Sequence, residues 1–225
     1  MSQSVKQMFG RIACRYDLLN RLLSARRDVG WRSKALALID GRPERVLDLA
    51  CGTFDLALQA LAAGKAASVH GCDFSHPMLV AGRGKIAGRG ISATVGDALA
   101  LPYADGSFDA AMCAYGWRNF DDPAAALREL RRVLVPDGQL LILEFFRPST
   151  LWTRTFYATF GRIAPLAGAL IARDAGAYRY LHDSVQGFLD PDQARDLLTA
   201  QGFTGLRAST CFGGVSHALW ARRSP

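Results

Sequence analysis

The chain has 225 residues, half of them hydrophobic and 21% charged, with a formal net charge of +7. This composition is typical of a globular protein and excludes a disordered or collagen-like chain. Domains average roughly 150 residues, and no Gly/Ser- or Pro-rich linker interrupts the sequence, so we expect one domain over residues 1–225. A chain this long buries roughly 70% of its unfolded surface and needs no disulfide or metal to fold.

The cysteines and histidines form no recognisable disulfide or metal-binding pattern. The five cysteines are odd in number and include no CxxC pair, and the four histidines are scattered. These features argue against a secreted disulfide framework and a zinc module, and they favour a reducing compartment. We therefore predict a cytoplasmic protein without a metal site.

The sequence predicts no membrane-spanning segment. The N-terminus has no apolar core of the kind that a signal peptide requires. The most apolar stretch, residues 163–172, is ten residues long and includes Pro165, whereas a spanning helix needs roughly 20 apolar residues. Residues 1–40 carry eight Lys or Arg against three Asp. Such a basic surface could meet an anionic membrane, nucleic acid or an acidic ligand, or it could be a solvated helix face.

In chain order, residues 5–40 show apolar residues at helical spacing and are predicted to be helical. Short apolar runs then alternate with helical segments. The predicted strands are 45–50, 67–74, 91–97, 108–116 and 138–146, and the predicted helices between them are 55–64, 76–85 and 123–134. Gly64 ends one of these helices and Asp122-Pro123 opens another. Strand–helix alternation over about 100 residues indicates a parallel sheet with helices on both faces.

After Glu144 the alternation stops. Residues 147–189 read as helices that leave the sheet, and we interpret them as a lid. Trp152, Phe156 and Phe160 recur there every four residues and indicate either core packing or an apolar binding surface. The alternation returns with a helix at 192–201 and strands at 203–209 and 215–221. Because no helix separates these two strands, they should form an antiparallel pair at the sheet edge.

Ligands of open α/β sheets bind at the carboxyl ends of the strands. The first such loop, residues 48–55, has Gly52 as its only glycine. A dinucleotide needs the fuller GxGxxG pattern, so this loop argues against one. Asp73 lies in the next loop, residues 72–75, 21 positions after Gly52. There it could accept hydrogen bonds from both ribose hydroxyls.

Two further loops complete the predicted site. Asp97, in residues 96–98, could accept a hydrogen bond from an exocyclic amine, and residues 114–119 would face the reacting group. Each acid could instead be a helix cap or turn residue. Acids at successive strand ends without a phosphate-binding glycine loop indicate a nucleoside ligand that lacks phosphates. S-adenosylmethionine fits this description.

Seven segments carry a more specific signal: 8–32 (MFGRIACRYDLLNRLLSARRDVGWR), 46–58 (VLDLACGTFDLAL), 73–79 (DFSHPML), 96–110 (GDALALPYADGSFDA), 115–122 (YGWRNFDD), 132–145 (RVLVPDGQLLILEF) and 178–188 (YRYLHDSVQGF). They resemble the ubiquinone/menaquinone biosynthesis C-methyltransferases, the UbiE type, over nearly the whole chain. The resemblance implies a Rossmann-like class I methyltransferase fold. This fold has a mostly parallel seven-stranded sheet, an antiparallel edge strand, N-terminal helices and a helical lid insertion at 147–189.

The resemblance also implies a cofactor, a substrate and their sites. The cofactor would be S-adenosylmethionine, bound by Asp48, Gly52, Thr53, Asp73, Phe74, Asp97 and Ala98, with Asp48 and Gly52 shaping the turn. A prenylated quinol would be methylated on a ring carbon in a pocket lined by Tyr16, Arg118 and Asn119. The substrate would be demethylmenaquinol, a ubiquinol precursor or both. Asp28, where ubiquinone-type members often carry histidine, favours demethylmenaquinol.

A neutral quinol carbon is a poor nucleophile, so the enzyme must favour the phenolate. Arg118 is a natural phenolate partner because it is a permanent cation with several donors. A water held by Arg118, Asn119 and Tyr16 could take the proton, with His182 or Asp17 as alternative bases. Arg118 could instead form a structural ion pair with Asp121 or Asp122.

The sequence departs from the family pattern at five positions: Cys14 replaces a proline, Phe54 a glycine, Ala114 a serine, Asp137 a glycine and Phe146 a serine. Phe54 either blocks the methionine end of the cofactor or points into the lid or the following helix. The second arrangement, which we expect, requires that its backbone avoid positive φ, because a bulky residue tolerates positive φ poorly.

Three function classes therefore stay open at this point. The first is quinol C-methylation, with the isoprenoid tail on the aromatic residues of 147–189, Arg154 and Arg162 near lipid headgroups, and peripheral contact between the basic N-terminal segment and an anionic membrane. The second is methylation of another target such as nucleic acid, against which residues 114–120 lack the Asn/Asp-Pro-Pro-aromatic pattern. The third is a non-catalytic scaffold or quinone-binding protein. We expect no nucleic acid partner, and the sequence leaves open whether the chain forms a homodimer.

Overall fold

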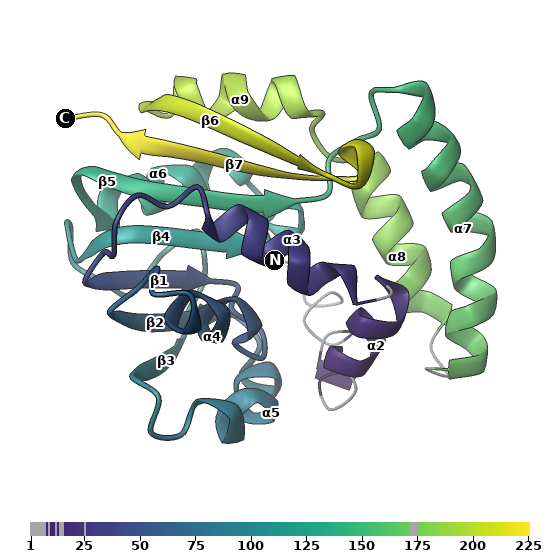
Figure 1. The fold of residues 1–225 in the computed structure, drawn as a ribbon, viewed down its shortest axis with the longest axis horizontal. Coiled ribbons are helices and arrows are strands. Elements are labelled where there is room, and N and C mark those ends of the chain that lie inside the picture. The colour runs from purple at the N-terminus through teal and green to yellow at the C-terminus, as the bar shows by residue number, and fades with distance from the viewer. Residues whose placement is uncertain (1–7, 9, 12, 14–15, 25, 172–174) are drawn as a thin grey trace.

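The computed structural model describes residues 8, 10–11, 13, 16–24, 26–171 and 175–225, and a seven-stranded sheet forms its centre (Figure 1). In chain order the strands are β1 (Arg45–Leu49), β2 (Ser68–Asp73), β3 (Ile91–Val95), β4 (Phe108–Ala114), β5 (Leu134–Glu144), β6 (Phe203–Cys211) and β7 (Ser216–Arg223). They lie in the order β3-β2-β1-β4-β5-β7-β6. β1 to β5 pair in parallel, and β7 is antiparallel to both β5 and β6. The predicted fold class, including the antiparallel pair at one edge, is confirmed.

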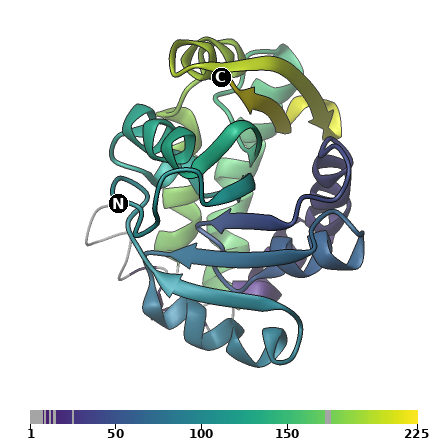
Figure 2. The ribbon, with the colours of Figure 1, turned by 90° about the vertical axis from the view of Figure 1, so that its left-hand side faces the viewer.

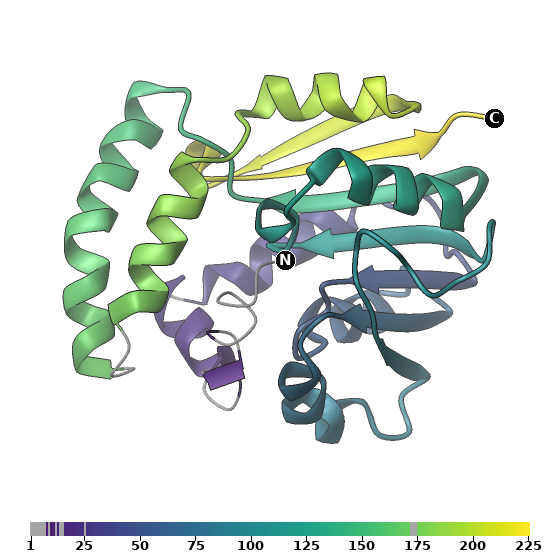
Figure 3. The ribbon, with the colours of Figure 1, turned by 180° about the vertical axis from the view of Figure 1, so that it is seen from behind.

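Helices cover both faces of the sheet (Figures 1 and 3). One face carries α3 (Arg27–Leu36), α4 (Asp55–Ala62) and α5 (His76–Ile86), and the other carries α6 (Pro123–Val133) and α9 (Pro191–Ala200). Val46 and Leu47 on β1 belong to different cores, because successive side chains of a strand point to opposite faces. Figure 2 shows the two sheet edges at opposite ends of the molecule, with β6 and β7 at the top and β3 at the bottom.

The ends of the helices follow the predicted signals. Asp122 caps α6, its side chain accepting a hydrogen bond from the backbone N–H of Ala125, with Pro123 in the first turn. Gly64, which follows α4, has a φ of +66°, a conformation that glycine adopts without strain. The predicted helix start and stop at these two positions are confirmed.

Two long helices lie beyond the carboxyl ends of β1 and β4. α7 (Leu151–Ile171) and α8 (Ala175–Gln186) run side by side, and α2 (Tyr16–Leu23) lies between α8 and α5 (Figures 1 and 3). The helical prediction for this part of the chain is confirmed. None of the described helices combines the length and apolar character needed to cross a membrane.

The aromatic stripe of α7 is partly covered. Trp152 is 51% exposed, whereas the ring of Phe156 stacks on Phe160 with centroids 6.0 Å apart and packs edge-on against Phe212 at 5.6 Å. The stripe therefore contributes to packing and also presents apolar surface. The side chain of Arg162 lies outside those described.

Two of the departures from the family pattern, Asp137 and Phe146, fall outside the predicted site. Asp137 adopts a φ of +63°, the conformation that suits the family's glycine, and its carboxylate pairs with Arg222 at 2.8 Å. Phe146 is buried and stacks on Phe188 with centroids 5.9 Å apart. Cys14 lies outside the described residues.

Candidate functional site

A cavity lies at the carboxyl ends of β1, β2, β3 and β4, where the strand order reverses between β1 and β4. This is the switch point at which open α/β sheets bind ligands. The space not filled by protein atoms is about 610 Å³, part of it open to solvent. Seven of the predicted site residues line it, namely Tyr16, Gly52, Asp73, Phe74, Asp97, Ala98 and Asn119, together with Ala114. Asp48, Thr53 and Arg118 are not among the lining residues.

Asp73 organises the loops after β1 and β2. One carboxylate oxygen accepts a hydrogen bond from the backbone N–H of Gly52 and the other from that of Ser75, both at 2.8 Å. Burial raises the pKa of Asp73, and these two hydrogen bonds only partly oppose the rise. Gly52 itself has a φ of +53°. The acid and the glycine, which are 21 residues apart, thus form one unit of the cavity wall.

Asp48 supports this wall from behind. It is 1% exposed, and its carboxylate accepts a hydrogen bond from the backbone N–H of Ala57 in the first turn of α4 at 3.2 Å. Burial raises its pKa to about 8. This geometry lets Asp48 shape the turn, and its side chain, which was also assigned to the cofactor, does not line the cavity.

The loop after β3 completes the wall. Asp97 accepts a hydrogen bond from the backbone N–H of Leu99 at 3.0 Å, and it is half-buried. A Cβ at Gly96 would lie 2.7 Å from the sulfur of Cys72, so this loop can approach β2 only because residue 96 has no side chain.

A buried hydroxyl suggests that the cavity receives a polar ligand. Ser75 is 1% exposed and lines the cavity, and its Oγ has no hydrogen-bond partner among the described residues. A polar atom buried without a partner is costly, so it commonly marks a ligand or water position. Sequence reasoning quoted this residue in the loop after β2 but did not assign it to the site.

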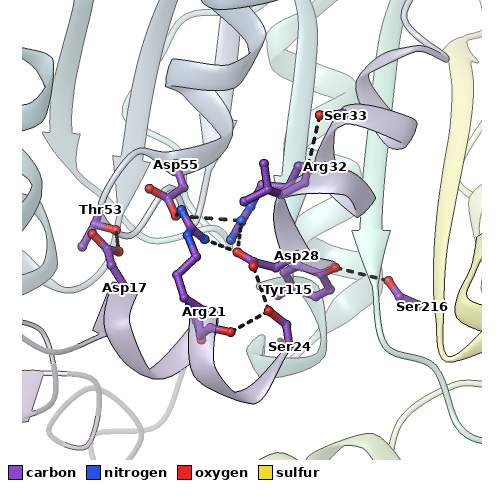
Figure 4. A network of polar contacts seen from close by, with 12 residues as sticks. Asp17, Arg21, Ser24, Asp28, Arg32, Ser33, Thr53, Asp55, Tyr115 and Ser216 are labelled. Carbon is purple, nitrogen blue, oxygen red and sulfur yellow. Dashed lines mark hydrogen bonds and ion pairs between the residues drawn. The ribbon is translucent and has the colours of Figure 1, made fainter. Parts of the chain in front are cut away.

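Thr53 is turned toward helix α2 (Figure 4). Its hydroxyl donates a hydrogen bond to Oδ1 of Asp17 at 2.5 Å, and Lys85 on α5 pairs with both Asp17 and Asp55 at 2.7 Å. The side chain that the resemblance assigns to the cofactor therefore joins α2 to the cofactor turn. These contacts also engage Asp17, one of the alternative bases, outside the cavity.

Asp28 joins α2 and α3 to the same region (Figure 4). Its buried carboxylate accepts hydrogen bonds from Ser24, Arg21 and Arg32, and Arg21 reaches on to Asp55 at 2.8 Å. Burial alone would raise the pKa of Asp28, but these donors and the two guanidinium charges lower it. Asp28 does not line the cavity. Its side chain could therefore influence a bound substrate only indirectly, through this network.

Phe54 points away from the cavity, as expected, but its ring lies between β2 and α5 and not in the lid. Its ring is fully buried between β2 and α5, where a Cβ at Gly71 would lie 2.7 Å from Cε1 and a Cβ at Gly82 would lie 2.6 Å from Cδ2. The condition that its backbone avoid positive φ is wrong, since its φ is +70°. The two glycines give the ring a place in the core, and burying it offsets the strain. The main argument for a non-catalytic protein was that Phe54 blocks the cofactor, and the position of its ring contradicts that argument.

Arg118 lies in the short helix η2 (Trp117–Asn119), which follows β4. Its guanidinium donates to Oε1 of Glu144 at 2.7 Å and to the carbonyl oxygen of Tyr115 at 2.8 Å. Arg118 therefore forms an ion pair, but its partner is Glu144 at the end of the neighbouring strand β5, which was not considered in the sequence analysis. Asp122, one of the two partners considered, instead caps α6 and lies 3.7 Å from Arg128.

Asn119 connects the cavity to α8. Its side-chain oxygen accepts a hydrogen bond from the hydroxyl of Tyr180 at 2.8 Å, and its nitrogen donates to the carbonyl oxygen of Tyr115 at 3.3 Å. On α2, burial raises the pKa of Tyr16, so its hydroxyl keeps its proton at neutral pH. His182, the other alternative base, packs against Gly161 and bonds Asp183, and it does not line the cavity.

Comparison with known proteins agrees with this geometry. The model of the ubiE/COQ5 methyltransferase family matches residues 1–222. The demethylmenaquinone methyltransferase of Thermus thermophilus is 46% identical over 201 residues, which cover 88% of this chain and 91% of that protein. The ubiquinone/menaquinone biosynthesis C-methyltransferase UbiE of Geotalea uraniireducens is 39% identical, covering 95% and 94%.

The solved structures give the same fold. A SAM-dependent methyltransferase from Thermotoga maritima superimposes with a TM-score of 0.72 over 97% of this chain and 99% of that one, at 19% sequence identity. At this identity the likeness concerns the fold alone.

Proposed function

The chain belongs to the ubiE/COQ5 methyltransferase family, and on this basis we propose that it methylates a ring carbon of a prenylated quinol, with S-adenosylmethionine as the methyl donor, in respiratory quinone biosynthesis. Demethylmenaquinol is the substrate we favour, because the relative at 46% identity is named for it. The observation that carries the proposal is the cavity at the switch point, which is lined by Asp73, Asp97 and Ser75. The buried hydroxyl of Ser75 has no partner among the described residues.

The residues of the cofactor site suit a nucleoside without phosphates. We assign Asp73 to the ribose hydroxyls, Asp97 to the exocyclic amine of the base and Ser75 to a further polar contact. Gly52 and Ala98 leave room for close approach of the ligand to the backbone. When bound, S-adenosylmethionine supplies an electrophilic methyl group on a sulfonium.

The acceptor residues have to make a ring carbon nucleophilic. A quinol hydroxyl loses its proton near pH ~10 by analogy with tyrosine, so the site must favour the phenolate. We assign this role to the guanidinium of Arg118, whose own pKa above ~12 excludes it as the base. Asn119 and Tyr16, which line the cavity, would hold a water that takes the proton.

The surrounding helices would contact the rest of the substrate. We propose that α7 and α8 act as the lid of the single domain, and that Trp152, Phe156 and Phe160 contact the isoprenoid tail with Arg154 near lipid headgroups. We further propose peripheral binding of residues 1–40 to anionic membranes, since each basic side chain near such a surface contributes about 1 kcal/mol. Co-sedimentation with anionic vesicles should occur at low salt and be lost at high salt. Binding that does not change with salt concentration would contradict this proposal.

The proposal is tested by quinone analysis. A bacterial strain lacking its own quinone C-methyltransferase should regain methylated menaquinone when it expresses this chain, as measured by mass spectrometry of extracted quinones. Methylation of the ubiquinone precursor alone would show that the substrate is a ubiquinol precursor and not demethylmenaquinol. No methylated quinone, despite cofactor binding by the purified protein in calorimetry, would contradict the proposed substrate class.

A further inference from the structure

Glu144 is a fully buried carboxylate to which the sequence analysis assigned no role. It ends β5 and is 0% exposed. Its Oε1 accepts hydrogen bonds from Nη1 of Arg118 at 2.7 Å and from the backbone N–H of Phe145 at 2.8 Å, and its Oε2 accepts from the backbone N–H of Arg118 at 3.2 Å. Glu144 therefore holds both the side chain and the backbone of Arg118.

The remaining contacts of Arg118 fix its guanidinium further. Nε donates to Oγ of Ser184 on α8 at 3.3 Å, and Nη1 also reaches the carbonyl oxygen of Tyr115. Nη2 forms no hydrogen bond with any described residue. It is also not fully buried, so a ligand could reach it. Nε and Nη1 are thus occupied, and Nη2 is left to bind a ligand.

Such a pair is expensive to bury. Removing two charges from water costs several kcal/mol per ion, so a buried pair often adds little to stability compared with apolar residues. The Arg118 and Glu144 side chains are only 6% and 0% exposed. Their burial next to the cavity is therefore better explained by a role in chemistry than by stability.

We propose that Glu144 is a positioning residue for the methyl transfer. It aims Nη2 of Arg118 at the phenolate oxygen of the acceptor, and its negative charge limits how strongly the guanidinium stabilises that phenolate. A phenolate held by an uncompensated cation forms at lower pH but is a weaker nucleophile. This inference rests on the proposed function, since it needs a phenolic acceptor.

The pair stands among neutral groups near pH 7. The titratable groups facing it are Cys113 on β4, Tyr115 after β4, Tyr16 on α2, Tyr157 on α7 and Tyr180 on α8. Burial raises the pKa of each of them, so all five keep their protons there. Arg32 lies beside Tyr16 and Tyr115, and Asp121 lies beside Tyr180. Asp73 lies beside Tyr16 and Cys113, and Asp48, whose pKa is raised to about 8, also lies beside Cys113.

The test compares wild type with Glu144→Gln, which keeps the size of the side chain and removes its charge. With a short-chain demethylmenaquinol we expect kcat to fall at least tenfold, while KM for the quinol and Kd for S-adenosylmethionine stay within about threefold. The acidic limb of the kcat–pH profile should move to lower pH by about one unit. A kcat loss that only follows the loss of folded protein, with the limb unmoved, would overturn the proposal.

Gln139→Ala is the matched control, near the middle of β5. Gln139 accepts hydrogen bonds from the backbone of Asp40 at 2.8 Å and from Nε1 of Trp220 at 2.9 Å. Its loss should lower stability but leave kcat per folded molecule and the pH limb unchanged. If Glu144→Gln does not fold, Glu144→Asp takes its place, because it keeps the charge but cannot reach as far. Glu144→Asp should lower kcat without moving the limb, and an unchanged kcat would overturn the proposal.

A second readout does not depend on methyl transfer. The pKa of a bound nitronaphthol, whose phenolate is coloured, should be lower in Glu144→Gln than in wild type by about one unit. Equal values in the two proteins would overturn the role of Glu144. A wild type that lowers the probe's pKa but methylates no quinol would instead contradict the proposed function and leave the role of Glu144 supported.

Discussion

The two walls of the cavity are held in place by different interactions. The cofactor wall consists of the loops after β1, β2 and β3, and it depends on backbone donors and missing side chains: Asp73 holds two backbone N–H groups, and Phe54 packs between two glycines. The acceptor wall consists of α2, η2, the end of β5 and α8. Of these elements, α2 and η2 supply the lining residues Tyr16 and Asn119, while the end of β5 and α8 support them from behind. This wall depends on side-chain pairs such as Arg118–Glu144 and Tyr180–Asn119.

This difference predicts two kinds of damage. A substitution in the cofactor wall should act through space and backbone position, and it should lower stability or cofactor affinity. A substitution in the acceptor wall should act through charge and orientation, and it should lower turnover while the cofactor still binds. The following substitutions test this distinction.

The largest effect is expected for Gly82→Ala in α5. Its Cβ would lie 2.6 Å from the ring of Phe54 and 2.8 Å from the backbone of Thr53, so the cofactor turn itself must move. We expect a loss of about 3 kcal/mol in the free energy of unfolding and weaker binding of S-adenosylmethionine, measured by denaturation and calorimetry. Gly84→Ala in the same helix is the control, because nothing lies within 4 Å of its Cβ. It should be neutral or stabilising by roughly 0.5–1 kcal/mol. Equal losses for the two variants would contradict the packing role of Gly82.

Asp73→Ala should weaken cofactor binding next. It removes charge-assisted hydrogen bonds worth roughly 1.5–3 kcal/mol, or about ten- to a hundredfold in Kd. The fold should persist, with the backbone N–H groups of Gly52 and Ser75 left to find water. A Kd equal to that of wild type in calorimetry would show that Asp73 does not bind the cofactor.

Arg118→Lys tests the acceptor wall. Lysine keeps the charge but lacks the planar fork that contacts Glu144, Tyr115 and Ser184 together. We expect kcat to fall about tenfold, roughly 1.4 kcal/mol in the barrier, with Kd for S-adenosylmethionine almost unchanged. Turnover of a demethylquinol at the wild-type rate would show that Arg118 has a structural role and takes no part in the reaction.

Phe54→Gly should have the smallest effect on cofactor affinity. The ring is buried on the far side of the turn, so we expect Kd to change by less than tenfold, about 1.4 kcal/mol. Stability should fall because a buried ring is lost, and calorimetry should therefore be run where both proteins are folded. If wild type fails to bind at millimolar ligand while the variant binds, the enzyme proposal fails.

The cofactor wall could be predicted from the sequence because its signals are local. Asp73 and Asp97 follow recognisable apolar strands, and strand ends in a parallel sheet meet at one edge. The backbone conformation of individual residues in this wall could not be predicted from the sequence. The positive φ of Phe54 depends on the space that Gly71 and Gly82 leave for its ring, and those residues lie on other elements.

The acceptor wall was predicted less well because its partners are distant in sequence. The carboxylates considered for Arg118 were its near neighbours, whereas Glu144 lies 26 residues away. One signal was present: Glu144 is a lone charge at the end of the run LLILE, next to the strand that leads to Arg118. Thr53 shows the same limit, since its partner Asp17 lies 36 residues before it.

The position of β7 has a consequence for how the chain is made. β7 lies between β5 and β6, so the edge of β5, with its apolar residues 140–143, stays unpaired on the ribosome until residues 216–223 have been synthesised. An unpaired apolar strand edge is a template for aggregation. Nascent chains that stall before Ser216 should therefore depend on chaperones far more than the finished protein does.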